Sequence, residues 1–186
     1  MNANANVPSS TSHYPTAPTA QRDVTHTLSV LVDNEPGVLA RVIGLFSGRG
    51  YNIDSLTVSE TEHEAHLSRI TIVTRGTAQV LEQIRAQLEK LVQVRDVANA
   101  GRDPNSVERE LALVKVRGTG ADRVEALRIA DIFRAHVIDT THESFIFEVT
   151  GAPSKIEQFT ALMRPLGLVE LSRTGVLSIT RGPERM

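Results

Sequence analysis

Hydrophobic positions alternate or recur at helical spacing from His26 onward, and they predict six elements in the first half of the chain. The segment HTLSVLVD at 26–33 places Leu28, Val30 and Val32 on one face, as in a half-buried strand. A helix is expected next, then strands over 51–59 and 67–74, a second helix and a closing strand over 92–98. The two helices are marked by apolar residues at helical spacing: Val38, Leu39, Val42, Ile43 and Phe46, then Val80, Leu81, Ile84, Leu88 and Leu91.

The same order of elements starts again after residue 110. We expect a strand over 111–116, a helix over 121–135, a hairpin over 136–150, a helix around 156–163, and closing strands over 168–171 and 175–179. Val124, Leu127 and Ala130 are expected to face inward from the first of these helices. The sequence Gly-Tyr-Asn-Ile-Asp at 50–54 holds the same place in its unit as Ala-His-Val-Ile-Asp at 135–139. The pattern therefore predicts an α+β fold with two ferredoxin-like βαββαβ units.

Four segments follow from this division. Residues 1–23 form a tail, and positions 1–21 contain no Asp, Glu, Lys or Arg, which predicts disorder. The first unit spans 24–100, a linker spans 101–108, and the second unit spans 109–182. The tail lacks the basic start and apolar core of a secretory signal, so we expect a cytoplasmic protein.

Composition narrows the classes of function. The chain has 186 residues, of which 40% are hydrophobic and 23% charged, with a net charge of -2. Because nucleic-acid binding by phosphate neutralisation requires a basic surplus, we expect no nucleic-acid partner. No apolar run approaches the roughly 18 residues that span a bilayer, so we expect no membrane segment. The sequence has no Cys, which excludes thiol nucleophiles and Cys-ligated metals.

Two motifs suggest chemistry but have simpler explanations. His63 and His66, beside Glu62 and Glu64, have the spacing of metal ligands, but they fall in and beside a predicted hairpin loop, where a solvated polar loop is the default. Gly118–Arg123 with Asp139 resembles half of a dinucleotide fingerprint. Its third Gly is missing, and the following strand returns through a hairpin instead of a helical crossover. We expect neither a metal nor a catalytic residue in this chain.

The first strand–helix loop is the best candidate for a binding site. Asn34 can cap free backbone N–H groups or bond a ligand, and Pro36 suits the first turn of a helix. Gly37 allows close approach of a ligand, and the N–H groups at a helix start attract a carboxylate. With Val38 and Leu39 as apolar surface, the loop suits a small apolar amino acid. The alternative is a plain connection with a capped helix.

Several sequence runs resemble an ACT domain and, more closely, the regulatory (small) subunit of acetohydroxyacid synthase, also called acetolactate synthase. The resemblance covers about residues 24–182. It rests on NEPGVLARV at 34–42, GLFSGRGYNIDSL at 44–56, SRITIV at 68–73, LEQI at 81–84, QLEKLV at 87–92, RELALVKV at 109–116, IFR at 132–134 and SRTGV at 172–176.

The resemblance implies a non-catalytic regulator of branched-chain amino acid biosynthesis. Its large catalytic subunit would hold thiamine diphosphate, Mg and FAD, and this chain would hold no cofactor. The first unit, as an ACT domain, would bind effector and form a homodimer. Valine, with leucine or isoleucine as further candidates, would bind where two ACT domains meet. One chain would contribute Asn34 and Gly37, and the other Asn52. Further effector residues implied by the resemblance are Glu35, Pro36, Val38, Leu39 and Ile53.

Other hypotheses remain open from sequence alone. An ACT-type module could sense amino acids for another enzyme. RNA-recognition domains share the βαββαβ order but need exposed aromatics on their central strands, and 67–74 has none. A small enzyme on this scaffold would need a catalytic set, and none is recognisable. Each unit has only roughly 75 ordered residues, so its core is small and pairing of units or chains is expected.

Overall fold

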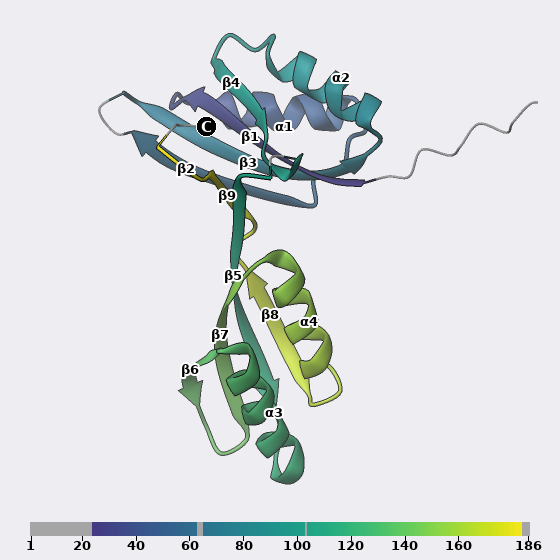
Figure 1. The fold of residues 1–186 in the computed structure, drawn as a ribbon, viewed down its shortest axis with the longest axis vertical. Helices are drawn as coiled ribbons and strands as arrows, with labels where there is room; N and C mark the ends of the chain where they lie inside the picture. The colour runs from purple at the N-terminus through teal and green to yellow at the C-terminus, as the bar shows by residue number, and fades with distance from the viewer. Residues whose placement is uncertain (1–23, 63–64, 103, 184–186) are drawn as a thin grey trace, which may run out of the picture.

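A computed structural model describes residues 24–62, 65–102 and 104–183. The tail predicted over 1–23 lies outside the described residues. In the first unit two helices cover one face of a four-stranded antiparallel sheet with strand order β2-β3-β1-β4, which is the ferredoxin-like arrangement (Figure 1). Its elements are β1 Val24–Asp33, α1 Val38–Gly48, β2 Ser55–Glu62, β3 Leu67–Gly76, α2 Ala78–Leu88 and β4 Val94–Asn99.

The core of the first unit lies between the sheet and the two helices. Leu28 on β1 is opposite Ile72 on β3, and both are fully buried beneath Phe46 of α1. Phe46 also meets the ring of Tyr51 edge-on at 6.1 Å between centroids. The strand expected from Tyr51 begins only at Ser55, because residues 51–54 carry the chain from the end of α1 to the sheet.

The second unit repeats this order with strand order β6-β7-β5-β8. Its core joins three phenylalanines: Phe147 lies 6.1 Å from Phe159 and 5.3 Å from Phe145 between ring centroids. Its elements are β5 Ser106–Arg117, α3 Gly120–Phe133, β6 His136–Thr140, β7 Ser144–Gly151, α4 Pro153–Met163 and β8 Leu168–Arg173. The prediction of an α+β fold with two ferredoxin-like units is confirmed.

The prediction for the inward face of α3 was wrong at two positions. Val124 and Leu127 are 67% and 39% exposed, whereas Ala126, Ile129 and Ala130 pack into the core. The small side chains of Ala126 and Ala130 let α3 approach the sheet closely. A spacing argument that favours larger apolar residues selects the neighbouring face instead.

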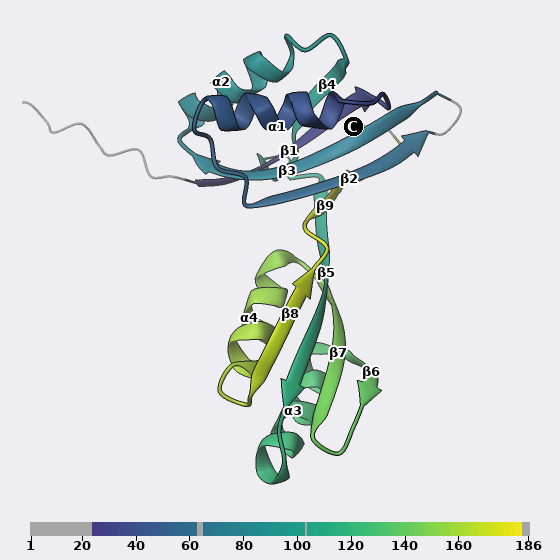
Figure 2. The same ribbon diagram turned by 180° about the vertical axis from the view of Figure 1, so that it is seen from behind.

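The last predicted strand also lies elsewhere. β9 (Leu177–Thr180) does not extend the sheet next to β8; it pairs with Ser106–Arg109, the first residues of β5. This two-stranded ribbon and the short helix η1 (Ala100–Arg102) lie on the face of the first sheet opposite α1 and α2 (Figures 1 and 2). Thr27 and Thr71, on that face, are therefore buried at 4% and 3% exposure.

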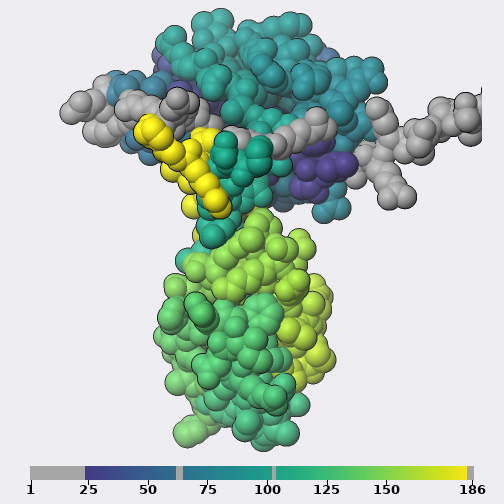
Figure 3. All heavy atoms as spheres, viewed as in Figure 1, coloured from purple at the N-terminus to yellow at the C-terminus, as the bar shows by residue number. Residues whose placement is uncertain are grey.

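The two units meet at a narrow neck. On the face seen in the space-filling view, the lobes meet around the first residues of β5 and the yellow C-terminal segment (Figure 3). Because β5 is one continuous strand, its first residues belong to the ribbon under the first sheet and its later residues pair with β7 and β8. The relative position of the lobes thus depends on this strand and on the return through Thr174–Val176.

Candidate effector site

The loop of residues 34–37 carries the chain from β1 into α1. Gly37 is the N-cap residue of α1, with φ at 88° in the left-handed region. Pro36 lies in the turn before the helix and not in its first turn, where the sequence placed it. The turn into the helix requires one residue with a positive φ. The ring of Pro36 fixes its φ at a negative value, whereas Gly37 adopts a positive φ without steric cost.

The start of α1 is open to a ligand. Within the described chain no side chain hydrogen-bonds to this end of the helix, and the first turn of α1 contains no acidic residue. A Cβ added to Gly37 would meet no described atom within 4 Å. Leu39 is 38% exposed beside this space, whereas Val38 packs into the core at 4% exposure. The backbone N–H of Val38 donates to the carbonyl of Glu35 at 3.4 Å, so the N–H groups of Leu39 and Ala40 are the donors at this helix start that can attract a carboxylate.

Asn34 is bound to the β2–β3 hairpin. Its backbone N–H donates to the carbonyl of His66 at 2.6 Å, and its Nδ2 donates to Oε1 of Glu60 at 3.4 Å. The exposed Glu35 donates its backbone N–H to the carbonyl of Asp33 at 2.9 Å. Asn34 thus lies near the end of β2 at Glu62, and it does not cap α1.

Asn52 lies near the other end of the same strand. Its Nδ2 donates to Oδ1 of Asp54 at 2.6 Å, and its backbone carbonyl accepts the hydroxyl of Thr74 at 2.6 Å. The second carboxylate oxygen of Asp54 accepts Nε of Arg75 at 2.7 Å. Ile53 is half-buried against the first core. The sequence analysis missed Asp54 and Arg75, and the Asn-x-Asp spacing was the signal that could have indicated Asp54.

One chain does not bring the predicted effector residues together. Asn34 and Gly37 precede α1, whereas Asn52 and Ile53 follow it. At about 1.5 Å per residue, the 11 residues of α1 separate the two groups by roughly 16 Å. A site that uses both groups requires a second chain.

The weaker candidates from the sequence have structural roles or lie outside the description. His63 and Glu64 are outside the described residues, and among the described residues no group of three or more His, Cys, Asp or Glu side chains could hold a metal ion. In the Gly118–Arg123 loop, Gly118 donates its N–H to Glu143, and the guanidinium of Arg123 lies 3.9 Å from the ring centre of Phe145. β6 pairs antiparallel with β7, so the helical crossover of a dinucleotide fold is not formed. In the described part of the chain, no helix is both long and apolar enough to cross a membrane.

Comparison with known proteins agrees with this organisation. A family model described as an AHAS small subunit-like ACT domain matches residues 28–96, and a model described as the small subunit of acetolactate synthase matches residues 109–182. The chain is 48% identical over 160 residues to a probable acetolactate synthase small subunit of Archaeoglobus fulgidus, covering 86% of this chain and 99% of that one. It is 48% identical over 159 residues to the acetolactate synthase small subunit of Mycolicibacterium smegmatis, covering 86% and 92%.

A solved structure gives the same result. The acetolactate synthase small subunit of Thermotoga maritima superposes with a TM-score of 0.76 at 42% identity, and the match covers 87% of this chain and 99% of that one. The fold and the family models together define a two-unit regulatory protein whose first unit is an ACT domain. The chain belongs to the family of acetolactate synthase small subunits. Such a subunit implies a large catalytic partner, and the family acts in branched-chain amino acid biosynthesis.

Proposed function

We propose that this chain activates the thiamine-diphosphate-dependent catalytic subunit of acetolactate synthase and makes it sensitive to feedback inhibition by valine. The chain performs no chemistry and holds no cofactor. Thiamine diphosphate, Mg and FAD belong to the catalytic subunit. Leucine and isoleucine are the further effector candidates, because they offer the same carboxylate and ammonium groups on a branched apolar side chain.

The observation that carries the proposal is the position of β2. This strand is at the edge of the first sheet, and Asn34 contacts Glu60 near one of its ends while Asn52 precedes the other end at Ser55. If two copies pair through β2 around a two-fold axis, the strands run antiparallel. The Asn34 end of one chain then lies beside the Asn52 end of its partner, at two symmetric places.

The chemistry of each such place suits a small apolar amino acid. The open start of α1 at Gly37 offers N–H groups to the effector carboxylate. The side-chain oxygens of Asn34 and of the partner's Asn52 can accept hydrogen bonds from its ammonium group. Leu39 and Ile53 are only partly buried and offer apolar surface to a branched side chain. We therefore propose a homodimer with two effector sites between its ACT domains.

The test adds this chain to the purified catalytic subunit of the same organism and measures acetolactate formation. The rate should rise several-fold, and valine between about micromolar and millimolar concentration should then lower it, as expected for a sensor of metabolite pools. Leucine and isoleucine are compared in parallel. An unchanged rate on adding the chain would refute activation, and an activated rate that none of the three amino acids lowers would refute the effector role.

A further inference from the structure

The ribbon of β5 and β9 turns its polar face inward, against the first sheet. Glu108 is opposite Ser178 and Ser106 is opposite Thr180, and residues opposite each other on antiparallel strands share a face. Ser178 is buried, and its Oγ, Oε1 of Glu108 and Oγ1 of Thr180 have no hydrogen-bond partner among the described residues. The inner face of the ribbon is therefore a polar surface that the protein itself covers.

The outer face of the same ribbon is largely apolar and is open to solvent. Val107 is opposite Ile179, and Arg109 is opposite Leu177. Ile179 is 65% exposed and Leu177 is 48% exposed, although Ser178 between them is buried. The yellow segment that holds β9 lies at the surface beside the neck (Figure 3). Because hydroxyls turned inward and apolar side chains turned to water do not stabilise an isolated chain, the pattern indicates that a partner covers the outer face.

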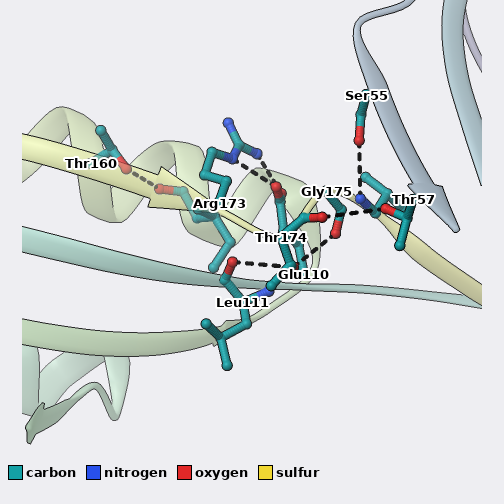
Figure 4. Close-up of polar contacts among 10 residues, drawn as sticks. Ser55, Thr57, Glu110, Leu111, Thr160, Arg173, Thr174 and Gly175 are labelled. Carbon is teal, nitrogen blue, oxygen red and sulfur yellow. Dashed lines mark hydrogen bonds and ion pairs between the residues drawn. The ribbon is translucent and has the colours of Figure 1, made fainter. Parts of the chain in front are cut away.

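The ribbon is held in a fixed position where the chain returns from β8 to the first sheet. Figure 4 shows two bonds to β2: the hydroxyl of Thr57 donates to the carbonyl of Thr174 at 3.3 Å, and the N–H of Val176 donates to Oγ of Ser55 at 3.2 Å. Val176, the residue before β9, is also buried. The outer face is thus formed before any partner binds, which lowers the entropic cost of binding.

Two hollows lie where the lobes meet. The larger hollow is a cleft of about 600 Å³ that is lined by residues of both units. Each guanidinium group in its lining is bound to a carboxylate, Arg75 to Asp54 and Arg173 to Glu110. The arginines of this cleft are therefore already paired within the chain.

The smaller hollow adjoins the outer face of the ribbon and has a volume of about 430 Å³. Val107 and Arg109 of the ribbon line it, together with Arg181 after β9 and Pro153 at the start of α4. Arg109 donates from Nη1 to the backbone carbonyl of Glu108 at 2.7 Å, and among the described residues neither exposed arginine forms an ion pair. Since Glu108 is the one acidic residue among the described residues of the lining, the hollow has a surplus of positive charge.

The charges decide which partner suits this face. If two copies of the chain paired through it around a two-fold axis, Arg109 and Arg181 of one copy would approach the same residues of the other, and like charges repel. A different protein can instead offer an apolar patch to Leu177 and Ile179 and a carboxylate to the arginines, which bind carboxylates through paired hydrogen bonds. The family of this chain implies such a partner, the large catalytic subunit.

We propose that the outer face of the ribbon is a docking surface for the catalytic subunit. Leu177 and Ile179 pack against an apolar patch of that subunit, and Arg109 and Arg181 bind an Asp or Glu side chain that enters the smaller hollow. The identity of the partner rests on the proposed function. Because the ribbon lies under the first sheet and the hollow reaches the start of α4, a catalytic subunit docked here contacts both units of the chain.

The affinity of the full-length chain for the purified catalytic subunit tests the apolar part of the surface. Ile179→Glu removes apolar area and adds a charge that the acidic partner group repels, so it should raise the Kd at least tenfold. Val169→Glu is the matched control, since Val169 is 60% exposed but lies on β8, and it should change the Kd less than twofold. Ile179→Thr keeps a branched side chain that suits a strand and should weaken binding several-fold without disturbing β9.

Charge reversal tests the hollow. Arg109→Glu and Arg181→Glu should each raise the Kd at least tenfold, because a carboxylate from the partner would then face a carboxylate. Arg164→Glu makes the same change at the exposed C-terminal end of α4, away from the hollow, and should leave the Kd within about twofold. Equal losses in the three variants would attribute the effect to net charge and overturn the role of the hollow.

Binding, activation and self-association are measured separately. Unchanged affinity in both Ile179→Glu and Ile179→Thr, or an equal loss in Val169→Glu, would overturn the docking surface. Dissociation of the homodimer by Ile179→Glu in sedimentation would assign the face to a second copy and would also overturn it. A parent chain that binds the catalytic subunit without raising acetolactate formation would refute the proposed activation, while the affinities of the variants would still decide the surface. A parent chain that does not bind would overturn the docking proposal.

Discussion

Gly175 is seated directly against Ser55, across the junction of the two units. Its φ is 85°, and an added Cβ would lie 2.6 Å from Oγ of Ser55. The same Cβ would lie 2.7 Å from Oγ1 of Thr57. Glycine is required here twice, once by the backbone conformation and once by the contact with β2. The return of the chain onto the first sheet depends on this contact.

Replacing Gly175 with Ala should therefore destabilise the protein. The left-handed conformation costs an Ala about 1 kcal/mol, and displacement of Ser55 and Thr57 should bring the total loss to about 2–3 kcal/mol. Gly182→Ala is the control, since Gly182 also has a positive φ, at 94°, but an added Cβ there meets no described atom within 4 Å. Urea unfolding of both variants measures the difference. Equal stability losses would show that Gly175 matters for its backbone conformation alone.

Local sequence patterns were sufficient for much of this architecture. Alternation in β1 and helical spacing in α1 identified both elements and their buried residues, because Leu28 and Phe46 are large and strictly periodic. In α3 the buried positions are mostly alanines, so hydrophobicity alone pointed to Val124 and Leu127. β9 could not be assigned, because its partner Ser106–Arg109 is about 70 residues away and has no distinctive sequence pattern.

The candidate site shows the same limit of local information. The strand–turn–helix pattern predicted a helix start in this loop, but α1 begins at Val38 and Pro36 lies in the turn before it. Asp54 and Arg75 lie 21 positions apart, and only the pairing of β2 with β3 brings them together. The cleft between the lobes is lined by residues of both units, so no pattern within one unit could predict it. Sequence reasoning reached the residues of single elements but not the contacts between distant ones.

The ion pair between Glu110 and Arg173, at the junction of the two units, should contribute strongly to the stability of the folded protein. Glu110 is 4% exposed and binds Arg173 through both carboxylate oxygens. The hydrogen bond to Glu110 raises the pKa of Arg173 above its ordinary value, against the opposing effect of burial. Glu110→Gln should lower the free energy of unfolding by about 3 kcal/mol, because it leaves a partly buried guanidinium without its counter-charge.

Glu170→Gln is the control for that variant. Lys115 lowers the pKa of Glu170 through a hydrogen bond, yet the pair is exposed and should add little to stability. Chemical denaturation near neutral pH compares the two variants. If Glu110→Gln proves as stable as Glu170→Gln, the Glu110–Arg173 pair does not stabilise the junction of the two units.

The proposed homodimer predicts a sensitive position in the middle of β2. Val58 is 45% exposed on this edge strand, near the expected two-fold axis. Val58→Lys should place two like charges close together and weaken self-association at least tenfold. Val92→Lys makes the same change at a position that is 87% exposed and lies outside β2. Sedimentation at micromolar concentration should show dissociation for the first variant only; a dimer unaffected by Val58→Lys would place the interface elsewhere.

The effector loop gives the most direct test of regulation. Gly37→Asp would place a carboxylate where the effector carboxylate should bind, and Asn34→Ala would remove a polar anchor. Asp tolerates the left-handed conformation at a cost of up to about 1 kcal/mol, so the variant should fold. Both variants should still activate the catalytic subunit but should lose most of the inhibition by valine.

Gly44→Asp adds the same charge to an exposed position in the middle of α1 and should keep inhibition. Acetolactate formation is measured against valine concentration for all three variants. Because helix-end contacts with a carboxylate fade within the first turn, inhibition should depend on the position of the charge. Unchanged inhibition in Gly37→Asp would remove this loop from the effector site, and equal loss in Gly44→Asp would attribute the effect to charge alone.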